Sequence, residues 1–380
     1  MTEQTGTRTV GYCTNVHAGA TLEDVCAKLQ QHVPVIRQYL GDQGPLPIGL
    51  WLSRHALDDI LVNGVAQLNH TLDHMGAAVF TLNGFPYGNF HESEVKHRVY
   101  APDWSKSERL IYTIELARVL NLLVPPDTTA GISTLPVCWS NPSAKVLEAA
   151  AANLRTAASS LAAIEARTGT CLHVDLEPEP GCLLQRSQDV VDFFENHLLT
   201  VADEHIIRRH LRVCHDVCHA AVMFEPQADA IATYDAAGIA IGKVQVSSAL
   251  QADGGEPRQL EELSTFSEPR WLHQVCIRSN DQVSFYEDLP NALEGHEPDG
   301  GCWRIHFHVP VHQATLGSLS TTQPDLADAI DLLASRDDIT DWEVETYAWN
   351  AMPGFQGEHE LAKGIAEEIR WTRQRLGDAS

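Results

Sequence analysis

The chain has 380 residues, of which 44% are hydrophobic and 20% are charged, a composition typical of a folded globular protein. Its formal net charge is −25, from 26 Lys and Arg against 51 Asp and Glu. This balance argues against nucleic acid or an anionic membrane as the main partner, because both need a basic face. The nine cysteines form no CxxC pair, so we expect reduced thiols in a cytoplasmic protein. The N-terminal segment lacks a basic-then-apolar signal and no run of 18 apolar residues occurs, so we expect no direct membrane insertion.

Short strand-like segments recur along the chain, and helix-like stretches separate many of them. We expect strands at residues 10–17, 47–53, 77–84, 130–137, 170–177, 211–217, 242–248, 303–311 and 342–349. We expect helices at residues 22–40, 108–124, 144–168, 189–203, 324–336 and 357–376. The third of these helices is rich in alanine and has apolar residues at roughly helical spacing. The alternation of strands with helices indicates βα units and therefore a parallel sheet.

The number of βα units predicts an α/β protein with one (β/α)₈ TIM-barrel domain over residues 1–380. An insertion is expected near residues 250–300, where ADGGEP and GHEPDGG bracket an acidic, loop-prone segment. A doubly wound open sheet is the alternative architecture. It is disfavoured because no GxGxxG motif follows the first strand.

Polar residues gather at the carboxyl ends of several predicted strands, where TIM-barrel enzymes place their active sites. The strand within LHVDLEPEPGC ends in Glu177 and Glu179, and Pro178, Pro180 and Gly181 prevent it from continuing. The other strand ends carry Asn15 and His17, Asn83, Asp216 followed by His219, Gln245 and Ser247, His306 and His308, and Glu343 and Glu345.

Carboxylates and imidazoles from several strands at one barrel mouth are the groups that a divalent metal ion requires. Oxygen and nitrogen ligands together suit Mn, Zn, Co or Fe, and an oxygen-dominated set suits Mg. Asp216 and His219 are three residues apart and face the same side if a helical turn begins there. Strand periodicity places His306 and His308 on one face. Simpler interpretations exist, because a buried histidine is often a hydrogen-bonded core residue and Glu179 can accept amides from a following helix.

Several strings of the sequence together resemble the EboE family of metabolite-traffic proteins, within the xylose isomerase-like TIM-barrel superfamily. They are TNVHAG, GLWLS, FTLNGFPYGNFH, VKHRVYAPDW, ISTLPVCW, LEPEPGC, DVCHAAVMFE, HFHVPVH and VETYAW, and they extend over about residues 10–355. The superfamily includes ketose 3-epimerases, sugar isomerases, inosose dehydratases and type IV apurinic endonucleases. The EboE family is encoded beside cyclase-like, prenyltransferase-like and hydrolase-like proteins and is linked to export or processing of secondary metabolites. The resemblance therefore implies a small-molecule substrate and protein partners from the same pathway.

The resemblance also implies a set of metal ligands. Matched position by position, the superfamily's ligands fall on Glu177, on Asp216 with the accompanying His219, and on Glu345. The usual strand-seven histidine falls on Gln245, which departs from the pattern because an amide oxygen is a weaker ligand than imidazole. We expect His308 or His273 to supply what Gln245 does not.

In the superfamily's epimerases, two glutamates on opposite sides of the metal remove and return a carbon-bound proton. The resemblance implies that Glu177 and Glu345 form this acid–base pair and that His219 assists by positioning the substrate. The expected lining of the substrate pocket is His17, Asn83, Lys96, Trp104 and His306.

The leading hypothesis is a metal-dependent isomerase, epimerase or dehydratase that acts on a polyol or cyclitol-like metabolite. One alternative is metal-assisted hydrolysis of a small phosphoester, since the endonuclease branch uses more histidine ligands and this chain has 19 histidines. The other is a non-catalytic carrier of a pathway intermediate, which the glutamine at position 245 favours.

Overall fold

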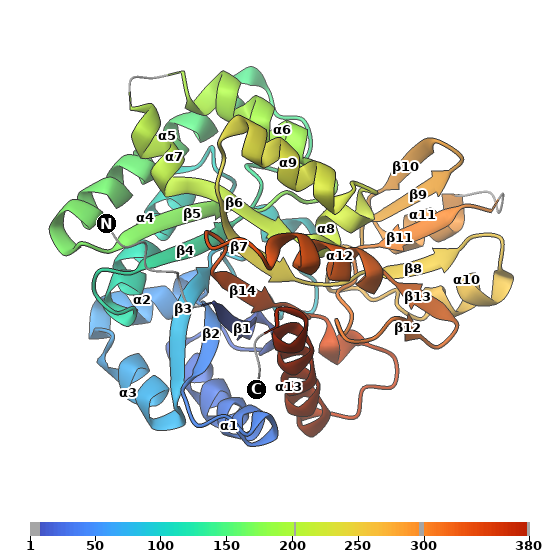
Figure 1. Cartoon of the computed structure of the whole chain (residues 1–380), viewed down its shortest axis with the longest axis horizontal. Helices are drawn as coiled ribbons and strands as arrows, with labels where there is room; N and C mark the ends of the chain where they lie inside the picture. Colours follow the sequence, from blue (N-terminus) through green and yellow to red (C-terminus); the bar gives the residue numbers. More distant parts are fainter. Residues whose placement is uncertain (1–7, 201–202, 296–299, 378–380) are drawn as a thin grey trace.

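Eight parallel strands close into a barrel in the order β1–β14–β7–β6–β5–β4–β3–β2 (Figure 1). The structure is a computed structural model that describes residues 8–200, 203–295 and 300–377. The barrel strands are β1 (Thr9–Cys13), β2 (Leu46–Trp51), β3 (Ala77–Asn83), β4 (Thr129–Thr134), β5 (Cys171–Leu176), β6 (Leu211–Asp216), β7 (Ile241–Val246) and β14 (Asp341–Val344). The predicted TIM-barrel fold is confirmed. The predicted helix at 189–203 and the predicted insertion at 250–300 each include a few residues outside the described ranges.

Helices follow the barrel strands and form the outer layer of the barrel (Figure 1). They are α1 (Leu22–Leu40), α2 (Arg54–Asn63), α3 (Ala66–Met75), α4 (Ser107–Leu123), α5 (Ala144–Thr168), α6 (Ser187–Phe193), α7 (Glu204–His210), α8 (Val217–Val222), α9 (Gln227–Ala237), α12 (Gln323–Leu333) and α13 (Glu358–Arg375). The alanine-rich helix predicted at 144–168 coincides with α5. Within the described ranges, no helix combines the length and apolar character that a membrane crossing needs.

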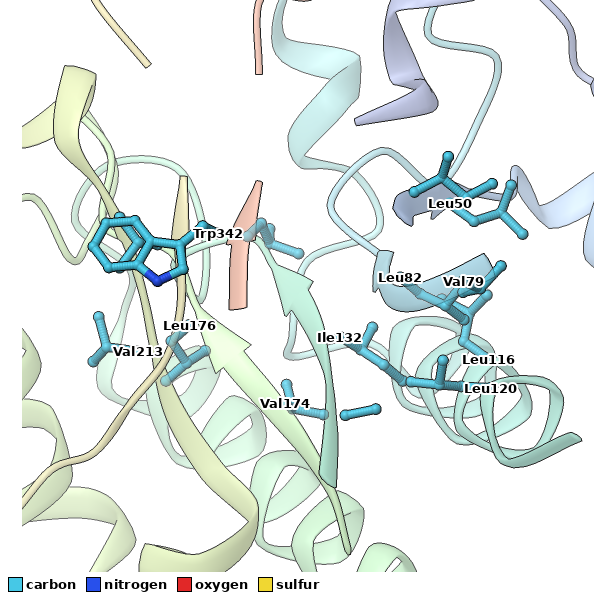
Figure 2. Packing of buried hydrophobic residues seen from close by; sticks show 14 of the residues in the cluster. Leu50, Val79, Leu82, Leu116, Leu120, Ile132, Val174, Leu176, Val213 and Trp342 are labelled. Atoms are coloured by element: carbon cyan, nitrogen blue, oxygen red, sulfur yellow. The ribbon is translucent and has the colours of Figure 1, made fainter. Parts of the chain in front are cut away.

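The outer helices pack on the barrel through a continuous apolar layer. Figure 2 shows Leu116 and Leu120 of α4 beside Val79 and Leu82 of β3 and Ile132 of β4. All five side chains are buried. This layer fixes the positions of the strand ends, because closely packed aliphatic side chains leave little freedom for a helix to shift against the sheet.

The chain between β7 and α12 forms a second, six-stranded sheet. This sheet extends to one side of the barrel (Figure 1). Its elements are β8 (Leu250–Asp253), α10 (Pro257–Ser264), β9 (Val275–Ser279), β10 (Gln282–Tyr286), α11 (Leu289–Gly295), β11 (Cys302–Ile305), β12 (Thr315–Leu316) and β13 (Leu319–Thr321). The strand order is β10–β9–β11–β8–β13–β12, and all pairs are antiparallel. A cluster of buried apolar residues supports this sheet separately from the main core of the barrel.

The strand predicted at 303–311 is wrong beyond Ile305. Strand β11 ends at that residue and belongs to the second sheet, and the segment 306–311 has no regular secondary structure. Pro310 has no N–H to offer a sheet. The chain instead turns toward the barrel mouth, where the Val309 amide donates to Ser248 O at 2.9 Å. His306 and His308 therefore reach the barrel mouth on an irregular segment and not on a strand.

The interior of the barrel contains a buried ion pair below its mouth. Lys243 Nζ of β7 donates to Glu343 Oε2 of β14 at 2.5 Å, and both side chains are fully buried. The same ammonium donates to Asn83 Oδ1 at 3.1 Å and Ser133 Oγ at 3.2 Å, so all three of its protons are used. Asn83 Nδ2 donates to Glu343 Oε1 at 2.7 Å. Gly49 on β2 leaves the space that the Glu343 carboxylate fills, because a Cβ there would overlap it.

The C-terminal helix α13 is attached to the loop after β14 by one buried carboxylate. Glu368 accepts hydrogen bonds from Thr346 Oγ1 at 2.5 Å, Val311 N at 3.1 Å and Trp349 Nε1 at 3.1 Å. Burial is the main cause that raises the pKa of Glu368 to about 7, and these three donors partly offset it. Because Thr346 follows Glu345 in the chain, this contact helps to fix a loop that belongs to the barrel mouth.

Candidate metal centre and substrate cavity

A cavity opens at the carboxyl end of the barrel strands. It encloses about 590 Å³ between atoms, including its open mouth. Its polar lining residues are Asn15, Asn83, Lys96, Tyr100, Glu177, Glu179, His219, His306, His308, Glu345 and Tyr347. Its apolar lining residues are Phe85, Pro86, Phe90, Val99, Trp271 and Leu272. The cavity therefore lies where the strand-end residues were expected to meet.

Three carboxylates from different strands converge at the carboxyl end of the barrel, and two of them, Glu177 and Glu345, line this cavity. Glu177 follows β5, Asp216 ends β6 and Glu345 follows β14, and one oxygen from each lies within 4.8 Å of the other two. Asp216 also caps α8, because its Oδ1 accepts the His219 amide at 2.9 Å. Asn15 Nδ2 donates to Glu345 Oε1 at 2.6 Å. These bonds hold Asp216 and Glu345 in place, and Glu177 is positioned by its place directly after β5.

The convergence raises the pKa of two of these carboxylates. Burial is the largest cause for Glu177, and the neighbouring Glu345 and Asp216 add to it, so its pKa lies well above the usual value. Burial and the same Asp216 raise the pKa of Glu345 to about 8. Three buried acidic groups this close favour proton uptake or a bound cation, because either one removes the repulsion between them.

Three histidines at the cavity present one ring nitrogen each to it. The Nδ1 atoms of His219, His306 and His308 lie 2.8 Å from Pro178 O, 2.7 Å from Gln274 Oε1 and 2.8 Å from Glu345 O, respectively. A carbonyl oxygen only accepts, so each Nδ1 carries the proton and each Nε2 of a neutral ring carries a lone pair. Burial lowers the pKa of His306 well below its usual value and that of His308 to about 4. Neutral rings with the far N–H fixed on a carbonyl are the form in which histidine binds metals.

The Nε2 atoms of His219 and His306 lie 3.0 Å apart. Two lone pairs at this distance repel each other, so a proton or a cation between them is required to stabilise the arrangement. Two nitrogen ligands bonded at about 2.1 Å and at right angles around one metal ion would be about 3 Å apart. The pair, together with a carboxylate oxygen of Glu179, forms a second group of ligand atoms within 4.8 Å of one another.

Unpaired buried polar atoms show that the residues present fit a divalent cation. Asp216 Oδ2, His308 Nε2, Asn15 Oδ1 and both amide atoms of Gln245 are buried without a hydrogen-bond partner among the described residues. Leaving such atoms unpaired is costly, and a cation would satisfy the oxygen and nitrogen acceptors together. His308 Nε2 lies 3.9 Å from Asp216 Oδ2.

Of the two histidines expected to compensate for Gln245, His308 has the free nitrogen. Both ring nitrogens of His273 are already used, with Nδ1 3.0 Å from His306 O and Nε2 3.0 Å from Glu268 Oε1. His273 therefore supports the segment that carries His306 and has no nitrogen left for a metal. Gln245 itself is fully buried and is paired in register with Asp216 of β6.

The remaining residues expected in the substrate pocket lie in different places. Asn83 and His306 line the cavity, and Lys96 lines it with its Nζ bound to Asp288 Oδ2 at 2.5 Å. Trp104 is fully buried outside the cavity lining, and its Nε1 donates to Thr134 Oγ1 at 3.1 Å. His17 also lies outside it, where its ring stacks on His32 with centroids 4.1 Å apart and its Nε2 is 3.1 Å from Tyr12 Oη.

Several cavity residues did not enter the predicted site. Glu179 accepts hydrogen bonds from Tyr100 Oη at 2.7 Å and Gln274 Nε2 at 2.9 Å, and Asn15 holds Glu345. Glu179 and Asn15 stand at predicted strand ends, so the sequence contained a signal for them. Gln274, which binds Glu179 from outside the cavity lining, immediately precedes β9 of the second sheet and has no such signal.

Comparison with known proteins supports the fold. No protein-family model and no curated protein matches the chain. Among solved structures, one that is similar is a xylose isomerase-like TIM-barrel protein from Mycobacterium smegmatis in complex with magnesium, with 10% identity, a TM-score of 0.54, and coverage of 99% of this chain and 98% of that one. Another is the IolI protein with a bound zinc atom, with 10% identity, a TM-score of 0.51, and coverage of 97% and 98%. The chain therefore has the xylose isomerase-like TIM-barrel fold.

Proposed function

We propose that this protein is a metal-dependent isomerase, epimerase or dehydratase acting on a small polyhydroxylated metabolite. The observation that supports the proposal most strongly is the set of unpaired buried acceptors around Glu177, Asp216 and Glu345. The two similar structures contain magnesium and zinc, which is consistent with a divalent ion here. Fold similarity alone does not identify a reaction, so the proposal depends on these side chains.

We assign the metal ion to Glu177, Asp216, Gln245, His308 and Glu345. Such an ion would polarise a carbonyl or hydroxyl of the substrate and so make a neighbouring carbon-bound proton easier to remove. Glu177 and Glu345 enter from β5 and β14, which have β6 and β7 between them in the barrel. Carboxylates that approach from two sides can remove a proton on one face of a carbon and return one on the other. We assign substrate positioning to His219, because it lines the cavity and Pro178 O fixes its Nδ1.

Metal content is the first test. We expect mass spectrometry of untagged, dialysed protein to find about one or more divalent ions per chain, and Glu177→Ala to lose them. Glu148→Ala, on the exposed face of α5, is the matched control and should keep the metal. Absence of metal after incubation with Mn²⁺ or Zn²⁺ would overturn the proposal and favour the carrier.

A second experiment separates the role of Glu345 as acid–base group from its role as ligand. The metal-loaded protein is incubated with polyols and cyclitols in D₂O, and deuterium incorporation at carbon is measured. We expect Glu345→Gln to abolish exchange. If the variant keeps its metal but loses exchange, Glu345 transfers the proton. If the variant loses its metal, Glu345 acts mainly as a metal ligand.

The second donor group of Glu179, His219 and His306 favours hydrolysis of a small phosphoester as the second candidate. Clustered metal ions with several histidine ligands are suited to that reaction. Release of inorganic phosphate from small phosphoesters by protein that holds two or more metal ions would support this alternative over the isomerase.

The finer assignment rests on the sequence strings that resemble the EboE family. We propose on that basis a cytoplasmic role in processing or export of a secondary metabolite, together with protein partners from the same pathway. Co-purification of the chain with the products of neighbouring genes would test this role.

A further inference from the structure

One part of the cavity lining is apolar, in contrast to the carboxylates and histidines of the other part, which we call the floor. The apolar part consists of Phe85, Phe90 and Val99 from the segment after β3, Trp271 and Leu272 from the second sheet region, and Tyr347 from the loop after β14. The ring centroids of Phe90 and Trp271 are 5.3 Å apart, and both lie within 5.6 Å of the Tyr347 centroid. The rings of Phe90, Trp271 and Tyr347 form one continuous surface, which we call the aromatic wall.

Two polar groups, one on the aromatic wall and one next to it, are already engaged. Trp271 Nε1 donates to Phe90 O at 3.1 Å. Tyr100 Oη donates to Glu179 and accepts from Gln274 Nε2 at 2.8 Å. The indole N–H and this hydroxyl are therefore not free to bind the hydroxyl groups of a sugar, although sugars need such groups around their full circumference. Apart from the Tyr347 hydroxyl, this part of the cavity lining offers a ligand mainly apolar contact.

Among the described residues that line the cavity, none offers a free cationic anchor for phosphate. Lys96 is the single Lys or Arg among its described lining residues, and its ammonium is paired with Asp288 at 2.5 Å. Glu177, Glu179 and Glu345 line the same cavity. A phosphate group would need several free cationic donors, and the surplus of carboxylates would repel it.

The aromatic wall begins next to the candidate metal ligands. The Tyr347 centroid lies 4.7 Å from that of His308, whose Nε2 faces Asp216. A ligand held at the floor would therefore have its next few atoms against the aromatic wall.

We propose that the substrate has two chemically different parts. Its head carries adjacent oxygen groups, a hydroxyl beside a carbonyl or a second hydroxyl, and reaches the carboxylates and imidazoles of the floor. An uncharged hydrocarbon group, joined directly to the head, lies on the aromatic wall. This inference rests on the proposed function, because the head is placed by the metal site. It narrows the polyhydroxylated metabolite of the proposed function to one that also carries such a hydrocarbon group and no phosphate.

Three hydroxamates test the inference, because they share one head that chelates divalent metals through two adjacent oxygens. Acetohydroxamate has a methyl tail, benzohydroxamate a phenyl tail and phosphonoacetohydroxamate a charged tail. Isothermal titration calorimetry on Mn²⁺-loaded protein gives their dissociation constants. Each constant is divided by the dissociation constant of the same hydroxamate from Mn²⁺ in solution, which removes differences in the chelating strength of the head. We expect benzohydroxamate to bind at least tenfold more tightly than acetohydroxamate, because the phenyl ring buries more apolar area. Phosphonoacetohydroxamate should bind no more tightly than acetohydroxamate.

Variants locate the effect on the aromatic wall. In Trp271→Ala we expect the ratio of the acetohydroxamate dissociation constant to the benzohydroxamate dissociation constant to fall to about threefold or less. Unchanged binding of acetohydroxamate would show that the site of this variant is still folded. Phe90→Leu, a milder change, should reduce the ratio in the same direction. Leu332→Ala, an exposed residue outside the cavity, is the matched control and should keep the wild-type ratio.

The possible failures are distinguishable. Equal binding of acetohydroxamate and benzohydroxamate, or tightest binding of phosphonoacetohydroxamate, would overturn this inference and leave the metal-dependent function intact. A ratio that neither Trp271→Ala nor Phe90→Leu changes would also overturn it. Lack of metal-dependent binding by all three compounds would overturn the proposed function, and this inference with it.

Discussion

Replacing Lys243 by Met should destabilise the protein by about 3–5 kcal/mol, the cost of leaving a buried charge without its partner. The ammonium makes three hydrogen bonds, to Glu343, Asn83 and Ser133, and none of these groups can turn to solvent because all are buried. Burial lowers the pKa of Lys243, but Glu343 and the other acidic groups around it, including Glu177, together outweigh burial, so the net pKa is raised and Lys243 is protonated. In Lys243→Met, Glu343 would keep one donor, Asn83 Nδ2.

A double-mutant cycle measured by urea denaturation tests this reasoning. We expect Glu343→Gln alone to be destabilising as well, and the double variant to cost about 2–3 kcal/mol less than the sum of the two single changes. Lys363→Met is the matched control, since its ion pair with Glu367 is exposed and 3.5 Å long, and it should change stability by less than about 0.5 kcal/mol. Additive single changes, or a cost below about 1 kcal/mol for Lys243→Met, would refute the account of a mutually compensating pair.

Three further predictions concern space, protonation and metal. Gly49→Ala should cost about 1–3 kcal/mol in urea denaturation because its Cβ would overlap the Glu343 carboxylate, whereas Gly44→Ala, with no atom within 4 Å of its new Cβ, should be neutral. The pKa of Glu368 rises from 4.5 to about 7 on folding. The Glu368 carboxyl is therefore protonated in the folded and the unfolded protein below about pH 4.5, and ionised in both above about pH 7. Between these pH values the folded protein holds the proton more tightly, so the free energy of unfolding should fall by about 3 kcal/mol as the pH rises from about 4.5 to about 7. Glu368→Gln should remove this part of the pH dependence, and an unchanged difference between pH 5 and pH 8 would contradict it. Finally, a chelator should lower the Tm of metal-loaded protein, and excess Mn²⁺ should restore it, because a ligand that binds only the folded state stabilises it; an unaltered Tm would count against a resident ion.

The sequence was sufficient for the elements of the barrel and for the place where its carboxylates meet. Helix α5 follows from alanine content and helical spacing, and strand β5 follows from its alternation and the prolines after it. Such local patterns are encoded within one element. Glu177, Asp216 and Glu345 could be placed together because parallel strands bring their carboxyl ends to one edge of the barrel.

Only the tertiary structure decided what surrounds those carboxylates. His306 and His308 arrive on an irregular segment, although their spacing resembles a strand, and the bonding of His273 leaves His308 as the histidine with a free nitrogen. Lys243 and Glu343 are 100 residues apart, and no local pattern pairs them. The aromatic wall likewise joins segments after β3, before β9 and after β14. Contacts of this kind depend on how elements pack and where loops return, and the periodicity of a single element carries no information about either.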